Sequence, residues 1–203
     1  MNFILKLIIK NLPKKKLIIL LSSSCLLFFI IIFLFFNIRS FYVTDSNLKN
    51  NIGYIGEDIK NVSITKEIDY NDRKIVMYNY TKGFSKDIYL GITILDKTFI
   101  KGLYRKVQWG SCQQNFGIMV CSNGNLGLEN SSAIVYGYNP KKLAKFISLS
   151  IDGKIYSGKM SDEKYFITIF NNVEINSSSY GITFYDENKI DVSDKINDSG
   201  YTP

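Results

Sequence analysis

The sequence predicts a mainly β protein, in which an N-terminal single transmembrane helix is followed by an antiparallel β-sandwich ectodomain of one domain or two small β modules. Two observations predict this class. Residues 17–36 read LIILLSSSCLLFFIIIFLFF, twenty residues without a charge or a proline. From Asn71 onward, apolar and polar residues alternate in short runs bounded by Gly, Asn, Asp and Pro, which is the pattern of half-buried strands joined by turns.

The apolar segment is long enough to cross a membrane. A helix of twenty residues is roughly 30 Å long, which matches the hydrocarbon core of a bilayer. We therefore predict a transmembrane helix over 17–38, preceded by a cytoplasmic basic leader, 1–16. The leader carries five lysines and no acid, and Lys14, Lys15 and Lys16 adjoin the apolar segment. The excess of lysine before the segment predicts that the N-terminus is inside and the C-terminal domain is outside.

Three other interpretations of the apolar segment fit the residues less well. A cleaved signal peptide has a shorter apolar region and a small-residue cleavage site, which the end of this segment lacks. A lipoprotein needs an aliphatic residue where Ser22 stands and a polar linker after Cys25, but apolar residues continue to Phe36. A pilin-like subunit needs a glycine processing site and a glutamate, and neither is present. A retained signal anchor is the interpretation that we favour.

The position of the charges removes nucleic acid from the expected partners. The chain has a formal net charge of +7, with 25 Lys and Arg residues and 18 acids. Residues 1–40 hold six of the bases and no acid, which leaves 19 bases against 18 acids in the rest of the chain. The basic balance is therefore a signal of membrane topology, and it is not a surface for polyanions.

The β-rich part reads as a series of short strands. β-Branched and aromatic residues are frequent in these runs, as they are in strands. Asp152-Gly153 between two runs is the strongest hairpin signal in the chain. The expected strands are 74–80, 87–95, 103–109, 116–121, 133–138, 145–151, 154–157, 165–170 and 180–185.

Changes in composition suggest how this part is divided. Residues 39–70 are polar and read as a juxtamembrane spacer. Residues 71–130 form a first β-rich module, and 131–190 form a second β module, with a weakly patterned boundary before Ser132. The tail, 191–203, is acidic and is expected to be flexible.

Cys112 and Cys121 are the one pair of residues with a chemical mechanism of its own. If both lie outside the cell, their thiols can oxidise. A turn around Asn115 would bring them together, and a bridge of that loop length would contribute about 2–3 kcal/mol. A structural disulfide is the prediction. Two buried thiols or a redox or metal pair are the alternatives.

Lys97, Lys101, Arg105 and Lys106 form a basic cluster with no acid between them. Such a cluster could contact an anionic surface, either lipid headgroups or a wall polymer. The alternative is an ordinary solvated face.

The chain contains no histidine, which excludes Ser-His-Asp and Cys-His catalysis and histidine-ligated zinc. No phosphate-binding loop or dinucleotide fingerprint is present either, so we expect no enzyme activity, no cofactor and no metal. Hydrolysis of a sugar by two carboxylates stays open, because glycosidases need only a pair of Asp or Glu residues.

Several motifs occur together in the C-terminal half. A tyrosine-glycine strand ends in Asn139-Pro140, a hairpin follows at Asp152-Gly153, a Tyr-Phe strand begins at Tyr165, and a Tyr-Asp-x-Asn turn closes the set at Tyr185–Asn188. Together with 74–80, 91–95 and 102–109, this pattern resembles uncharacterised bacterial membrane-anchored or lipoprotein-like families. The resemblance implies a β-rich extracytoplasmic part that ends in an immunoglobulin-like module, here 131–190, and it implies no known activity.

These observations lead to one functional expectation and two alternatives. We expect a single-pass membrane protein of a bacterial envelope whose outer domain binds or scaffolds an envelope polymer, a peptide or another membrane protein. The alternatives are a membrane-tethered carboxylate-dependent carbohydrate hydrolase and a regulatory partner of a membrane sensor or transporter.

Overall fold

The computed structural model describes residues 22–31, 42–52, 58–113, 115–121, 131–174 and 179–197. The chain divides into two compact units, Met1–Phe41 and Tyr42–Pro203. Residues 22–31 of the first unit are helical. Within the described ranges, no helix combines the length and the apolar character that a membrane crossing requires. The leader with Lys14, Lys15 and Lys16, and the predicted span apart from 22–31, lie outside the described residues.

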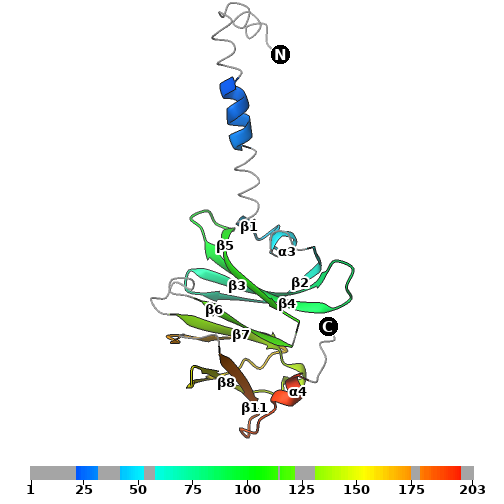
Figure 1. Cartoon of the computed structure of the whole chain (residues 1–203), viewed down its shortest axis with the longest axis vertical. Coiled ribbons are helices and arrows are strands. Elements are labelled where there is room, and N and C mark those ends of the chain that lie inside the picture. The colour runs from blue at the N-terminus through cyan, green and yellow to red at the C-terminus, as the bar shows by residue number, and fades with distance from the viewer. Residues whose placement is uncertain are drawn as a thin grey trace, which may run out of the picture. The chain divides into compact units, whose positions relative to one another are not determined.

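The second unit begins with a five-stranded antiparallel sheet, here called sheet A, in the order β1-β5-β4-β3-β2 (Figure 1). Its central strands are long and carry buried side chains on both faces. A short helix, α3 (Leu48–Asn51), follows the first strand. The strands are β1 (Tyr42–Thr44), β2 (Ile59–Tyr70), β3 (Arg73–Lys82), β4 (Ile88–Lys97) and β5 (Leu103–Cys112).

Two three-stranded antiparallel sheets follow. Sheet B has the order β10-β7-β6, and sheet C has the order β11-β8-β9. The strands are β6 (Phe116–Cys121), β7 (Ser132–Tyr138), β8 (Phe146–Ile151), β9 (Lys154–Lys159), β10 (Tyr165–Phe170) and β11 (Tyr180–Tyr185). A 3-10 turn, η1 (Pro140–Lys142), lies before β8, and a helix, α4 (Ser193–Asn197), lies after β11.

The predicted antiparallel β architecture is confirmed, and so is the predicted hairpin. Ile151 pairs with Lys154 across the turn that joins β8 to β9. Asp152 and Gly153 both have positive φ angles, 51° and 78°, as a two-residue hairpin turn of this kind requires.

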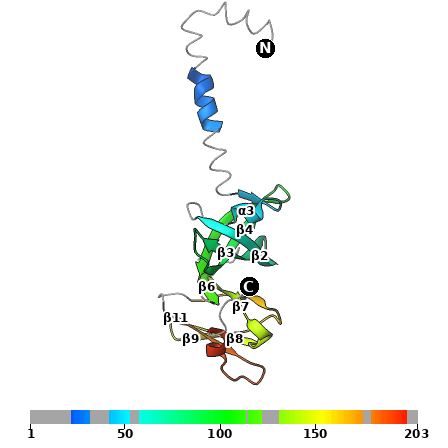
Figure 2. The same cartoon turned by 90° about the vertical axis from the view of Figure 1, so that its right-hand side faces the viewer.

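The three sheets are stacked with sheet B in the middle (Figures 1 and 2). Ile134 and Tyr136 of β7 pack with Ile75, Met77 and Ile92 of sheet A. Ala133 and Val135 point the other way and join the core that includes Leu149, Phe166 and Phe184. Every residue of β7 is buried for this reason. A third core lies on the outer face of sheet A, where α3 covers it.

Three boundaries predicted from composition differ from the structure. The expected spacer contains β1, α3 and the whole of β2, which pairs with β3 and is part of sheet A. The boundary expected at 130/131 falls between β6 and β7, which are paired neighbours in sheet B. The expected flexible tail contains α4, whose Ile196 is completely buried; residues 198–203 lie outside the described ranges. Amphipathic edge strands and short helices carry too little apolar sequence to be distinguished from a linker.

Candidate functional site

The structure does not support the predicted disulfide, because no bond joins Cys112 to Cys121. A methyl group added at Gly117 would lie 3.0 Å from Sγ of Cys112, which places that thiol beside Gly117. Cys121 stands four residues further along β6, a separation of about 13 Å in an extended strand. Disulfides need Cα atoms within about 7 Å, so the geometry of β6 keeps the thiols apart.

Three of the four residues in the predicted basic cluster bind other groups of the protein itself. Lys97 forms an ion pair with Asp69 at 2.9 Å, and Arg105 forms one with Asp96 at 2.5 Å. The side chain of Lys106 is buried and donates a hydrogen bond to the carbonyl oxygen of Asn51 at 2.9 Å. Burial lowers the pKa of Lys106. Of the four residues, Lys101 in the β4–β5 turn is the exposed one that makes no ion pair within the described chain.

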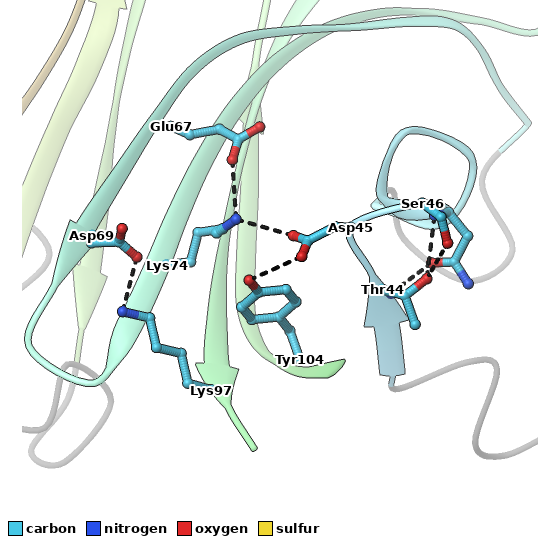
Figure 3. A network of polar contacts seen from close by, with 9 residues as sticks. Thr44, Asp45, Ser46, Glu67, Asp69, Lys74, Lys97 and Tyr104 are labelled. Atoms are coloured by element: carbon cyan, nitrogen blue, oxygen red, sulfur yellow. Dashed lines mark hydrogen bonds and ion pairs between the residues drawn. The ribbon is translucent and has the colours of Figure 1, made fainter. Parts of the chain in front are cut away.

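A network of charged side chains fastens the first residues of the domain to sheet A (Figure 3). Nζ of Lys74 contacts Asp45 at 3.2 Å and Glu67 at 3.3 Å. The Tyr104 hydroxyl donates to the Asp45 carboxylate at 3.5 Å, and Nζ of Lys74 lies 4.7 Å from the centre of the Tyr104 ring. Burial lowers the pKa of Lys74, but the hydrogen bonds with Tyr104, Asp45 and Glu67 outweigh it and hold the pKa above its ordinary value. The network joins Asp45, in the turn after β1, to side chains of β2, β3 and β5, so its role is structural.

The outer face of sheet C carries an open cavity of about 590 Å³, here called the β8–β9 groove. The sequence FISLSI of β8 explains it, because Ile147, Leu149 and Ile151 point into the core while Phe146, Ser148 and Ser150 point outward. The small hydroxyl side chains leave space above the middle of the sheet. The cavity is lined by Phe146, Ile147, Ser148, Ile155, Ser157, Gly158, Lys159, Tyr185 and Lys189.

The side chains of the β8–β9 groove are arranged in rows across the sheet. Phe146 is paired with Lys159 on one side and with Tyr185 on the other, so one end of the groove is aromatic and basic. Two residues further along β8, on the same face of the sheet, Ser148 is paired with Ser157. Hydroxyl groups therefore line the middle of the groove.

Lys189 reaches the same groove from the turn after β11. Oδ1 of Asp186 accepts hydrogen bonds from the backbone N–H groups of Asn188 and Ile190, both at 2.9 Å, and this fixes the turn. Neither Lys159 nor Lys189 forms an ion pair within the described chain. The basic groups of the groove are therefore available to a ligand.

A second cavity of about 490 Å³, the Asn79 pocket, lies between sheet A and β10. Asn79 is 9% exposed, and its Nδ2 donates to the Tyr165 hydroxyl at 3.5 Å. Its amide oxygen is buried and has no hydrogen-bond partner among the described residues. The register of β2 against β3 shifts twice beside it, which marks β-bulges. The lining is uncharged: Asn61, Ser63, Ile64, Thr65, Asn79, Tyr80, Thr81, Ile88 and Tyr165.

Two adjacent acids in the connection before β10 each form an ion pair. Asp162 forms an ion pair with Lys145 at 2.6 Å, and Glu163 forms one with Lys66 at 2.7 Å. Neither the β8–β9 groove nor the Asn79 pocket has an Asp or Glu in its lining. Among the described residues, no group of three His, Cys, Asp or Glu side chains could hold a metal ion. The chemistry that these two cavities offer is hydrogen bonding, apolar contact and, in the groove, positive charge.

Sequence reasoning did not find the β8–β9 groove, although a signal for it was present. The alternation in β8 could have placed Ser148 and Ser150 on an exposed face. The contribution of Lys189 could not be foreseen, because it depends on the turn after β11, a strand that is distant from β8 in the sequence.

Comparisons with protein-family models, with curated proteins and with solved structures find no match for this chain. The resemblance to membrane-anchored families with an immunoglobulin-like module therefore stays a prediction.

Proposed function

We propose that this protein is a single-pass, membrane-anchored extracytoplasmic binding or scaffolding protein of a bacterial envelope, and that the β8–β9 groove receives its ligand. The observation that carries the proposal is the place of the groove in the stack of sheets. The chain enters the domain at β1 in sheet A, and the groove lies on the outer face of sheet C, beyond sheet B. The groove is therefore on the sheet of the domain that is remote from β1.

The described part of the N-terminal unit is compatible with a lipid environment. In the helix at 22–31, the side chains of Leu26, Phe28 and Phe29 are exposed. Burying such side chains fully in an apolar medium is worth about 1.5–3 kcal/mol each. Together with the lysines that precede the apolar segment, this supports an anchor with the N-terminus inside and the C-terminal domain outside.

The chemistry of the β8–β9 groove favours an anionic polymer of the envelope. Lys159 and Lys189 supply positive charge, and Ser148 and Ser157 supply hydroxyl groups for hydrogen bonds. Tyr185 and its neighbour Phe146 offer aromatic surface to the apolar parts of a chain. A polymer that bears phosphate or carboxylate groups satisfies all three features.

The test uses the full-length protein in detergent and a fraction of anionic envelope polymer from the producing cells. A Lys159→Ser, Lys189→Ser double variant should bind this polymer at least tenfold more weakly than the unchanged protein. Lys49→Ser, Lys86→Ser is the matched control: it removes the same charge from exposed positions on α3 and in the β3–β4 loop. If both double variants lost polymer affinity equally, binding would depend only on net charge, and the groove would not be the binding site.

Anchoring and orientation need a separate measurement. Protease added to intact cells should digest the C-terminal domain, and a carbonate wash should leave the rest of the chain in the membrane fraction. If the protein crosslinks to another membrane protein in cells and does not bind the polymer, its ligand is a protein and the polymer is excluded. The hydrolase and regulator alternatives stay predictions without a supporting observation in the described residues.

A further inference from the structure

The turn between β4 and β5, residues 98–102, presents apolar side chains to the outside. Phe99 is 99% exposed and Ile100 is 49% exposed. Phe99 and Ile100 are adjacent, so together they present one continuous apolar surface to water. This turn is therefore a candidate contact surface.

The turn is ordered, so the exposure of Phe99 is a consequence of its architecture. The Thr98 hydroxyl donates to the carbonyl oxygen of Leu103 at 2.8 Å and lies 3.1 Å from that of Ile100. The backbone N–H of Leu103 donates to the Ile100 carbonyl at 3.1 Å, and Gly102 adopts a φ of 77° that closes the turn. The side chain of Phe99 is held outward by a hydrogen-bonded scaffold.

The charge of the turn suits an anionic lipid surface. The sequence Thr98-Phe99-Ile100-Lys101-Gly102 contains no acid, and Lys101 is exposed beside the apolar pair. Aromatic rings at headgroup level and lysines near anionic lipid are the two features that attach a protein segment to a membrane interface.

The turn also lies where the chain enters the domain. Thr44 of β1 is paired with Leu103, and Figures 1 and 2 show the β4–β5 connection beside β1. In the sequence, only five residues separate Phe36, the end of the apolar segment, from Tyr42. That stretch reaches at most about 20 Å when fully extended.

We infer that the Phe99–Ile100 turn inserts into the headgroup region of the membrane that anchors the chain, as a second point of attachment. The inference rests on the proposed anchoring. Phe84, in the β3–β4 loop, is equally exposed, but Nζ of Lys60 lies 4.8 Å from the centre of its ring. It also stands at the opposite end of β4, about 33 Å away along a ten-residue strand.

The experiment places a fluorescent reporter in the turn of the full-length protein. Trp109, the only tryptophan, is first replaced by phenylalanine. Phe99→Trp is then compared with Ile155→Trp, because Ile155 is 71% exposed on β9, in the outer sheet remote from β1. Ile100→Trp is a second reporter in the turn. Each protein is reconstituted into phosphatidylcholine vesicles with one quarter phosphatidylglycerol, with and without brominated phosphatidylcholine, and floated on a density gradient.

We expect the tryptophans at 99 and 100 to be quenched by brominated lipid at least twofold more than the tryptophan at 155, with emission shifted to the blue. Flotation with equal quenching at 99, 100 and 155 would overturn the inference and leave the anchoring in place. Protein that does not float with the vesicles would overturn the anchoring, and the inference with it.

Discussion

Nδ2 of Asn115 donates a hydrogen bond of 2.6 Å to the carbonyl oxygen of Ile196, which is 81 residues further along the chain. The same nitrogen donates to the carbonyl of Asn197 at 3.1 Å, and the backbone carbonyl of Asn115 accepts from the N–H of Tyr138 at 2.7 Å. One buried side chain thus ties α4 to the connection between sheets A and B.

Asn115→Ala should lower the free energy of unfolding by about 1–3 kcal/mol, because it leaves buried carbonyl groups at the end of α4 without a donor. The amide protons of 192–197 should then exchange faster with solvent. Urea unfolding and hydrogen exchange measure the two effects. Asn50→Ala, at an exposed position of α3, is the control and should change neither. Unchanged exchange in 192–197 would contradict the role given to Asn115.

Gly91→Ala should destabilise the protein by about 1–3 kcal/mol, because its new methyl group would lie 2.4 Å from the ring of Tyr78. That ring is packed against Tyr80, with ring centres 5.7 Å apart. Gly181→Ala is a matched strand substitution whose methyl group meets no atom closer than 4.0 Å. Thermal unfolding of both variants measures the difference, and equal midpoints would refute the close approach of Tyr78.

Lys74→Met should lower the free energy of unfolding by about 1–2 kcal/mol, because it leaves the carboxylates of Asp45 and Glu67 close together without the cation between them. The β1–α3 segment should become the first part of the domain to be cut by protease. The loss should be smaller in 1 M salt, where charges of this exposure are screened. Lys49→Met, on α3, is the control. A loss of stability that salt does not change would point to packing of the lysine stem.

Cys121 should make stability depend on alkaline pH. Burial raises the pKa of its thiol to about 12, against an ordinary value of 9.0, while the charge of Arg73 acts in the opposite direction. The folded state therefore keeps the thiol proton between pH 9 and 12, when the unfolded chain releases it. The contribution of Cys121 to the free energy of unfolding is therefore complete below pH 9. Between pH 9 and 12 it falls by up to about 1.4 kcal/mol for each pH unit.

Urea unfolding of the unchanged protein and of Cys121→Val at pH 8, 9, 10 and 11 tests this dependence. The unchanged protein should lose more stability than the variant over that range. The native thiol should also resist alkylation at pH 8, because little thiolate is present. A protein mass 2 Da below that of the fully reduced chain, with only one of the three thiols titratable in denaturant, would show that a disulfide forms after all.

The strands could be predicted from sequence because their signal is local. Alternation in YFITIF or YGITFY places one face inward whatever the rest of the chain does. The twelve residues of β2 were not recognised, because Lys60, Lys66, Glu67 and Asp69 make an edge strand look like a polar linker.

The candidate site could be predicted far less well than the strands. Lys97 and Lys106 are near each other in sequence, but Lys97 pairs with Asp69 of β2 and Lys106 donates to Asn51 of α3. The β8–β9 groove likewise exists only because β11 pairs with β8 and brings Tyr185 beside Phe146. Such relationships depend on tertiary pairing, which periodicity does not contain.

The burial of β7 on both faces has a consequence for how the domain can come apart. One face of β7, with Ile134 and Tyr136, belongs to the core shared with sheet A, and the other face, with Ala133 and Val135, belongs to the core shared with sheet C. If either outer sheet unfolds, the side chains on one face of β7 become exposed to water. The two cores should therefore melt in a single calorimetric transition, with the van't Hoff enthalpy equal to the calorimetric enthalpy. A gene truncated at codon 130 would yield β6 without its neighbour β7, and such a fragment should aggregate through the unpaired edge.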